Sequence, residues 1–273
     1  MADDLQKRRQ VAEAAARAAG AVHLRYYQTG IDYEGKHGDR RDALTRADLE
    51  GQQEAVRVIR EAYPDETIIG EEDDLPRERQ AEVLGGASWI IDPLDGTQDF
   101  VGNFPSFAAG VAYVEALRPQ VGVIYMTVYD EMFSAAQGLG ATLNGRPIHV
   151  NSDRPLADAM VGIHIRNVQP EPLAQFLETT GRVLSHAYGA RMLGCPMHSM
   201  AYVACGRLDA FATLSPTGLQ PCDLAPSEII LREAGGVCGT ELGAPYNILS
   251  TGISGASSQR LLDELFDVAR GRV

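Results

Sequence analysis

The segment Ser88–Asp92, "SWIID", is an unbroken apolar run that ends in a carboxylate. An unbroken run, in contrast to an alternating one, is typical of a strand that is buried on both faces of its sheet. Such a strand indicates a layered α/β protein. A second acid, Asp95, follows three residues later, directly ahead of Gly96 and Thr97. The strand therefore leads into two carboxylates, which a simple turn does not explain.

Periodicity and turn signals divide the rest of the chain into helices and strands. Helices are expected near residues 4–28, 48–63, 196–206, 222–236 and 257–270, with another from about residue 170. Strands are expected at residues 67–70, 106–115, 120–129, 131–137, 159–165, 182–187 and 209–214, with an Asn-Gly hairpin turn at 144–145. We therefore expect an α/β (α+β) fold in one domain, 1–273, with two intimate halves: 1–150 carries an antiparallel meander and 151–273 alternates.

Composition excludes several classes of protein. The 273 residues are 45% hydrophobic and 22% charged, as in soluble globular chains. No apolar run approaches the roughly 20 residues that span a bilayer, and the N-terminus carries no secretion signal, so we expect a cytoplasmic location. The net charge of −13 disfavours non-specific binding to nucleic acid or to an anionic membrane. The spacing of the four cysteines fits reduced core residues and no all-cysteine zinc site.

Acidic residues stand where predicted strands end or predicted helices begin, and such ends gather ligand sites in α/β folds. Mg²⁺ prefers carboxylates, a carbonyl oxygen and retained water. We expect a turn at Pro93 that leaves the Leu94 carbonyl free to point inward as one more oxygen. The chain therefore predicts a magnesium site made of four acids from three segments: Glu71, Asp92, Asp95 and Asp223.

Gly96 and Thr97 predict a phosphate site beside these acids. If "TQDFV" opens a short helix, the amides of both residues point outward from a helix N-terminus, where phosphate binds. The Thr97 hydroxyl is placed to orient an attacking water, and Glu71 is a plausible base. Metal ions beside a phosphate pocket indicate metal-assisted hydrolysis of a phosphate ester.

Each of these signals also has an ordinary structural explanation. "DPLDG" is a strong turn-former, and "GEEDD" reads as a solvated acidic loop. Asp223 is a good helix N-cap, and Thr45 with Asp48 could be another cap. Their combination and order, and no single motif, favour a functional site.

The motifs together resemble the inositol monophosphatase-like family, the Mg²⁺-dependent, lithium-sensitive phosphatases related to fructose-1,6-bisphosphatase. "WIIDPLDGTQDFVGNFP" is similar to the family's D-P-[IL]-D-G-T signature, and "PCDLAPSEIILREAGG" is similar to its second signature, W-D-x-A-A followed by E-A-G-G. "DALTRAD", "IIGEE" and "GATLNGRPIHV" also resemble family motifs. The likeness runs from about Lys36 to Gly236. It implies a layered αβαβα fold, commonly homodimeric, with two or three Mg²⁺ ions.

The resemblance also implies roles for individual residues. One metal would be held by Glu71, Asp92 and the Leu94 carbonyl, and a second by Asp92, Asp95 and Asp223. Glu71 would also reach a third metal, near Lys36 or His37. Water would be activated by Glu71 and Thr97, with Thr97 supported by Asp48 in a motif that also contains Thr45. Phosphate would be bound by Asp95, Gly96 and Thr97.

The residues that would select a substrate depart from the family pattern. Cys222 replaces a Trp, Asp99 an Asn and Gln98 a Thr. In place of a segment that offers an amide near the sugar ring, the chain has Cys195 and Pro196, and proline has no N–H to donate. Thr213 stands near the place of a glutamate that grips inositol hydroxyls. Inositol 1-phosphate is the family's default substrate, and the alternatives are histidinol phosphate, fructose 1,6-bisphosphate and 3′-phosphoadenosine 5′-phosphate.

Three rival classes are open to test. A haloacid dehalogenase-type phosphatase needs D-x-D-G-T, whereas the two acids here are separated by two residues. A nucleotide-binding oxidoreductase or kinase is disfavoured, because "GLGATLNG" lacks the third glycine of G-x-G-x-x-G and no G-x-x-x-x-G-K-[ST] occurs. A non-catalytic binding protein could keep the fold, but every expected metal acid and Thr97 are present. A phosphatase that acts on a small phosphorylated metabolite is therefore the expected class.

Overall fold

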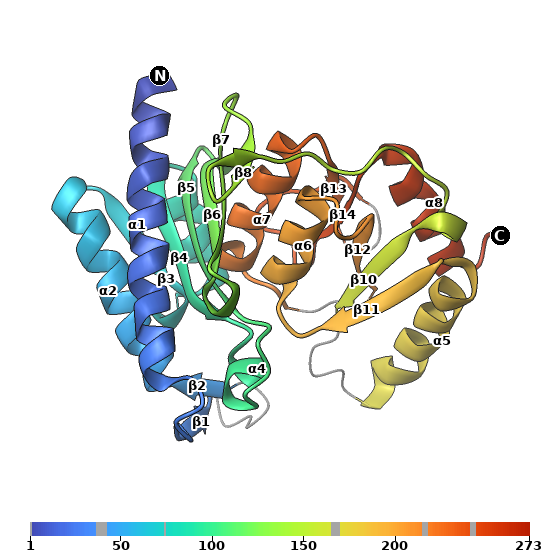
Figure 1. Cartoon of the computed structure of the whole chain (residues 1–273), viewed down its shortest axis with the longest axis horizontal. Helices are drawn as coiled ribbons and strands as arrows, with labels where there is room; N and C mark the ends of the chain where they lie inside the picture. Colours follow the sequence, from blue (N-terminus) through green and yellow to red (C-terminus); the bar gives the residue numbers. More distant parts are fainter. Residues whose placement is uncertain (1, 37–42, 74, 165–169, 215–217, 241–243) are drawn as a thin grey trace.

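The computed structural model describes residues 2–36, 43–73, 75–164, 170–214, 218–240 and 244–273. Within them the chain forms five layers: helices, a sheet, helices, a second sheet and helices (Figure 1). The expected layered αβαβα fold is therefore confirmed. The two sheets come from different parts of the chain, because the larger ends at Pro147 and the smaller begins at Met160.

The larger sheet has seven strands in chain order, and it is antiparallel except for the parallel pair at its start. It contains β3 (Thr67–Gly70), β4 (Ala87–Asp95), β5 (Ala108–Glu115), β6 (Arg118–Met126), β7 (Glu131–Ala136), β8 (Ala141–Leu143) and β9 (Arg146–Pro147). The expected "SWIID" strand is β4, which is buried from Ser88 to Asp95. The expected meander and the hairpin turn at Asn144 and Gly145 are also present.

The turn that we expected at Pro93 is instead a bulge inside β4. The strand continues to Asp95, and its register against β5 shifts between Asp92 and Asp95. Pairing with β3 ends at Ile91, so Pro93 lies beyond it. A proline cannot donate to a ladder, and such an interruption is where a sheet tolerates it. The bulge carries both aspartates.

One face of this sheet is covered by α1 (Ala2–Tyr26) and α2 (Arg46–Ala62), the two helices expected near residues 4–28 and 48–63. The buried side of α1 is a row of small residues, which lets the helix backbone approach the strands: Ala12, Ala15, Ala16 and Ala19. Four short elements complete this part: β1 (Tyr33–Gly35), β2 (Ala43–Thr45), the 3₁₀ turn η2 (Glu71–Asp73) and α3 (Arg77–Leu84).

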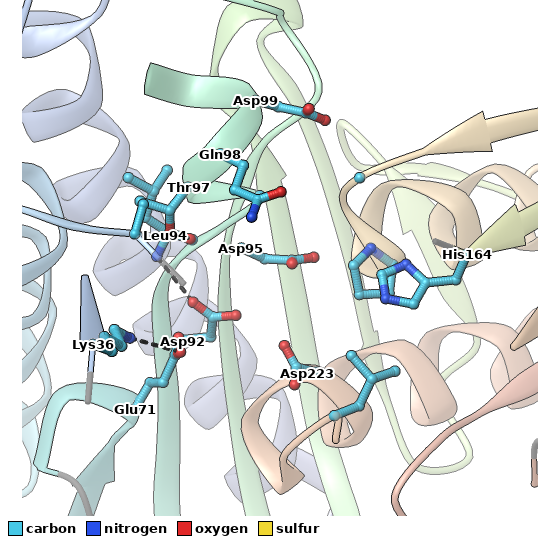
Figure 2. A pocket seen from close by; sticks show the side chains of 15 residues that line it. Lys36, Glu71, Asp92, Leu94, Asp95, Thr97, Gln98, Asp99, His164 and Asp223 are labelled. Atoms are coloured by element: carbon cyan, nitrogen blue, oxygen red, sulfur yellow. Dashed lines mark hydrogen bonds and ion pairs between the residues drawn. The ribbon is translucent and has the colours of Figure 1, made fainter. Parts of the chain in front are cut away.

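The opposite face is covered by α7 (Pro221–Glu233), with α6 (Pro196–Ala204) packed beside it. The approach of α7 to β6 is close, because a Cβ on Gly122 would lie 2.4 Å from Ile229 and 2.9 Å from Pro226. A helix from the second half of the chain is thus packed on the sheet of the first half. Its N-terminal end brings Asp223 to the end of β4 (Figure 2).

The smaller sheet has five strands in the order β11 (Gly189–Leu193), β10 (Met160–His164), β12 (Ala210–Thr213), β14 (Ser254–Ala256), β13 (Val237–Gly239). Its outer face is covered by α5 (Pro170–His186) and α8 (Gln259–Ala269) (Figure 1). The remaining elements are α4 (Thr97–Val101) and the 3₁₀ turns η3 (Thr127–Tyr129) and η4 (Leu156–Asp158).

One predicted strand is wrong. The strand predicted at residues 182–187 falls on the end of α5 and the residue after it. The strand that lies between α5 and α6 is instead β11. The apolar pair Val183–Leu184 resembles a short strand. In the structure Val183 is buried on the same face of α5 as Phe176, seven residues earlier. That spacing is helical and two turns long, so a short window does not reveal it.

Candidate active site

Three elements bring four acids to one place (Figure 2). Asp92 and Asp95 come from the bulged end of β4, Glu71 opens η2 directly after β3, and Asp223 lies in the first turn of α7. Carboxylate oxygens of Asp92, Asp95 and Asp223 lie within 4.8 Å of one another. These three side chains are 1%, 7% and 7% exposed. The structure thus brings together the four acids that the sequence predicts.

Backbone and thiol hydrogen bonds fix the three buried aspartates. The Leu94 amide donates to Asp92 Oδ1 over 3.0 Å. Asp95 Oδ2 accepts from the Met197 amide over 2.9 Å and from the Cys195 thiol over 2.8 Å. Asp223 is the third residue of α7, and its Oδ2 accepts from the amide of the N-cap residue, Gln220, over 2.6 Å. The N-cap of α7 is therefore Gln220 and not Asp223, as we had expected, and the contact that Asp223 makes with it is compatible with a place in the acidic cluster.

The cluster concentrates negative charge in a buried place. Burial and the neighbouring carboxylates, Glu71 first among them, raise the pKa of Asp92 well above its usual range. Burial and Asp223 do the same to the pKa of Asp95. Asp92 Oδ2 is buried and has no hydrogen-bond partner among the described residues. Buried like charges need a compensating cation, and an all-oxygen set suits Mg²⁺, so these residues fit the metal that the fold family implies.

One lysine partly offsets this charge. Lys36 Nζ lies 2.9 Å from Glu71 Oε1 and 2.8 Å from Glu72 Oε1. Burial by itself lowers the pKa of Lys36, but the two carboxylates raise it above its usual value, so the ammonium stays charged. His37, the other residue expected near a third metal, lies outside the described residues.

Thr97 is joined to α2 through Asp48. The Thr97 hydroxyl lies 3.0 Å from both Asp48 Oδ1 and the Leu94 carbonyl oxygen, and its single proton can serve one of them at a time. Asp48 Oδ2 accepts from the Thr45 hydroxyl over 2.6 Å and from the Thr45 amide over 2.8 Å. Burial raises the pKa of Asp48 to about 6, against the hydrogen bonds from Thr45. The cap that we expected at Thr45 thus also positions Asp48 beside Thr97.

Gly96 is required by the shape of the chain between β4 and α4. Its φ is +87°, a left-handed conformation that favours glycine. An added Cβ would lie 2.6 Å from the Ser106 carbonyl oxygen and 3.1 Å from the Cys195 side chain. The short helix that we expected over "TQDFV" is present as α4.

A pocket opens beside the cluster, lined by Lys36, Ala43, Glu71, Asp92, Leu94, Asp95, Gly96, Thr97, Gln98, Asp99, His164, Gly194, Pro196, Leu219 and Asp223. Of the three expected substrate residues, Pro196 lines it. Cys195 lies behind Asp95, and Thr213 is buried with its hydroxyl bonded to the Ile253 carbonyl. His164 lines the pocket and was missed by the sequence analysis. It ends β10 and is the last residue but one of the strand predicted at 159–165, so its position near a strand end is a signal that could have identified it.

The fold and site define a layered α/β protein with a buried carboxylate cluster suited to divalent cations. A model of the inositol monophosphatase family matches residues 4–271. The chain therefore belongs to the inositol monophosphatase family.

Individual relatives agree with this assignment. Nus factor SuhB of Haemophilus influenzae is 32% identical over 261 residues, which cover 95% of this chain and 94% of the relative. Inositol monophosphatase 2 of Solanum lycopersicum is 31% identical over 253 residues, 91% of this chain and 92% of the relative. Among solved structures, the Thermotoga maritima IMPase has a TM-score of 0.81, 29% identity and coverage of 98% and 97%. The extragenic suppressor protein suhB of Bartonella henselae has a TM-score of 0.85, 26% identity and coverage of 97% and 98%.

Proposed function

We propose that this chain is a Mg²⁺-dependent phosphomonoesterase that hydrolyses a small phosphorylated metabolite by attack of an activated water. The observation that carries the proposal is the buried cluster of Asp92, Asp95 and Asp223 next to the Thr97–Asp48 hydrogen bond. Membership of the inositol monophosphatase family supports phosphatase chemistry in general.

Glu71, Asp92, Asp95 and Asp223, with the Leu94 carbonyl, would hold the Mg²⁺ ions. Bound Mg²⁺ would polarise the phosphate and lower the pKa of water beside it. The Gly96 and Thr97 amides, with Asp95, would orient the phosphate. The attacking water would donate a hydrogen bond to the Thr97 hydroxyl oxygen, while the Thr97 hydroxyl donates its own proton to Asp48. Glu71 would take the proton released from the water, with Lys36 beside it as a compensating charge.

The residues that line the pocket affect which substrate it can bind. Pro196 offers no amide where inositol phosphatases have a donor, and Thr213 does not line the pocket. Hydroxyl recognition depends on paired hydrogen bonds, so we expect weak turnover of inositol 1-phosphate. Histidinol phosphate, fructose 1,6-bisphosphate and 3′-phosphoadenosine 5′-phosphate are the alternatives. Glu228, an acid of α7, does not line this pocket and pairs with Arg232.

A non-catalytic binding role is the second candidate, because relatives at 31–32% identity are named Nus factor SuhB, a name that states no catalytic activity. The net charge of −13 still disfavours non-specific nucleic-acid binding. None of the helices among the described residues has the length and apolar content to cross a bilayer. A homodimer in the cytoplasm remains our proposal for assembly and location.

The test is phosphate release from the four esters, with Mg²⁺, with a chelator, and with Mg²⁺ plus lithium. We expect Mg²⁺-dependent, lithium-sensitive release from one ester above the others. The matched control is Asp223→Asn, which keeps the size and a capping oxygen but removes one charge. Equal release by the control would place the activity elsewhere. No release by folded, Mg²⁺-bound protein would favour the non-catalytic role.

A further inference from the structure

Cys222 places a sulfur at the edge of the acidic cluster. It is the second residue of α7, directly before Asp223. Its sulfur, an oxygen of Glu71 and an oxygen of Asp92 all lie within 4.8 Å of one another. The residue is 4% exposed and also belongs to an apolar cluster that includes Ile69 and Ile90. A soft donor atom therefore faces two carboxylates that also belong to the proposed magnesium site.

This donor set is not one that Mg²⁺ prefers. Hard cations take oxygen ligands, whereas a thiolate selects softer or borderline cations, Zn²⁺ among them. Around a tetrahedral Zn²⁺ one sulfur and two oxygens lie roughly 3.4 to 3.6 Å apart, from bond lengths of about 2.3 and 2.1 Å. The separations here, which are at most 4.8 Å, come into that range by small rotations of the side chains.

A second observation also points to a cation at this place. Asp92 is 1% exposed, and its Oδ2 is buried with no hydrogen-bond partner among the described residues. A carboxylate oxygen in that position is satisfied by a metal ion. Lys36, 2.9 Å from Glu71, offsets part of the charge of one thiolate and two carboxylates around a divalent ion.

We infer that Cys222, Glu71 and Asp92 form a mixed sulfur and oxygen site for a borderline divalent cation such as Zn²⁺. Three protein ligands leave a fourth position of the tetrahedron for water. Because two ligands are shared with the proposed magnesium site, Zn²⁺ and Mg²⁺ compete, and Zn²⁺ acts as a reversible antagonist of Mg²⁺ binding. The inference concerns binding and does not depend on hydrolysis of an ester.

The other cysteines supply controls. The Cys195 thiol donates a hydrogen bond to Asp95, so replacing Cys195 would disturb the acidic cluster. Cys205 is half-buried, and its thiol lies 3.6 Å from the Tyr202 carbonyl, outside the site. The matched pair is therefore Cys222→Ser and Cys205→Ser, which make the same chemical change at and away from the site.

The test uses Co²⁺ as a spectroscopic substitute for Zn²⁺, added to the full chain after treatment with a chelator. We expect a sulfur-to-cobalt charge-transfer band in the near ultraviolet for the native protein and for Cys205→Ser, and its loss in Cys222→Ser and Cys222→Ala. Zn²⁺ should abolish the band at equimolar amounts. Calorimetry should show that Cys222→Ser binds Zn²⁺ about tenfold more weakly or worse, since a soft ligand is lost, while Mg²⁺ affinity changes less.

Two results would overturn the inference. One is Co²⁺ binding to the native protein without the band, which would make Cys222 a packing residue of the apolar cluster. The other is a band that survives in Cys222→Ala. Because no ester is present, these results are distinct from a failure of the proposed phosphatase function, which would appear as an absence of phosphate release with the band intact.

Discussion

His23 of α1 donates its Nε2 proton to the carbonyl oxygen of Pro93, 2.7 Å away, inside the β4 bulge that carries Asp92 and Asp95. A carbonyl can only accept, so the proton lies on Nε2. Nδ1 is then the acceptor for the Thr127 hydroxyl, 3.0 Å away. The imidazole is completely buried. A helix far from the acids in sequence thus holds the segment between two of them.

Replacing His23 should loosen this segment. His23→Phe keeps an aromatic ring of similar size but leaves the buried Pro93 carbonyl without its donor, which costs about 1–3 kcal/mol. We expect the free energy of unfolding to fall by that amount in chemical denaturation. We also expect weaker Mg²⁺ binding by calorimetry, because Asp92 and Asp95 lose their fixed separation.

Thr127→Val is the control for His23, since it removes the other partner of the imidazole and leaves the Pro93 contact in place. It should lower stability with little change in Mg²⁺ affinity. Equal Mg²⁺ affinity for His23→Phe and the native protein would show that the bulge keeps its shape without the histidine.

The same histidine predicts a loss of stability in acid. Burial lowers the pKa of His23 from 6.5 to about 4, against the hydrogen bond to Pro93. At this residue the unfolded chain then binds a proton more readily than the folded one. The contribution of neutral His23 to the free energy of unfolding is therefore complete above about pH 6.5 and is lost as the pH falls towards 4. Between pH 7 and pH 4.5 the loss amounts to about 2 to 3 kcal/mol.

The measurement is the free energy of unfolding at both pH values, for the native protein and for His23→Phe. The buried carboxylates change stability with pH in the opposite direction, but both proteins contain them. The difference in the free energy of unfolding between the two proteins therefore isolates the effect of the histidine. That difference should shrink by about 2 to 3 kcal/mol at the lower pH. A pH-independent difference would mean that the imidazole is protonated with equal ease in both states.

Much of the site could be predicted because its signals are local. Asp92 and Asp95 follow an apolar run, and Asp223 lies in the first turn of a helix, where its carboxylate accepts from the Gln220 amide. The same is true of Thr45 and Asp48, whose capping geometry needs only neighbouring residues. Local hydrogen bonds and the burial pattern of one strand are properties of short segments, which a single sequence carries.

Contacts between distant segments could not be predicted in this way. The bond from His23 to Pro93 joins residues 70 apart, and the thiol contact from Cys195 to Asp95 joins residues 100 apart. Neither has a periodic or turn signal, because each depends on how a helix packs against a strand end. His164 reaches the pocket only because the smaller sheet ends beside the larger one.

Mg²⁺ should stabilise the protein more at high pH than at low pH. Without metal, burial and neighbouring acids raise the pKa values of Asp92 and Asp95. A group whose folded pKa is raised contributes stability at low pH and loses it as the pH rises through that pKa. The metal-free protein therefore weakens as these acids ionise, and Mg²⁺ removes the repulsion. Thermal unfolding at pH 8 and pH 5.5, with Mg²⁺ or a chelator, measures the effect.

Asp223→Asn sharpens this comparison, because it removes one charge and keeps an oxygen for the Gln220 amide. Its metal-free form should be at least as stable as the native protein at pH 8, and Mg²⁺ should raise its melting temperature less than it raises that of the native protein, because one of the proposed metals loses a ligand. A full Mg²⁺ response in this variant would contradict the assignment of Asp223 as a metal ligand.

Thr97 should matter for turnover more than for metal binding. Its hydroxyl lies 3.0 Å from Asp48 Oδ1 and 3.0 Å from the Leu94 carbonyl oxygen, and it contributes no charge to the cluster. Thr97→Val keeps the shape and removes the hydroxyl, so we expect turnover of the preferred ester to fall about a hundredfold or more. Mg²⁺ affinity, measured separately by calorimetry, should change by less than about threefold.

Thr97→Ser is the matched control, since it keeps the hydroxyl and removes only a methyl group. It should retain most of the turnover that Thr97→Val loses, because Asp48 can still accept its proton. If Thr97→Val loses turnover and Mg²⁺ affinity together while Thr97→Ser keeps both, the hydroxyl acts by holding the Leu94 carbonyl in place for the metal, and water would have to be oriented by another residue. The ratio of the two losses in each variant therefore assigns the hydroxyl to one of these tasks.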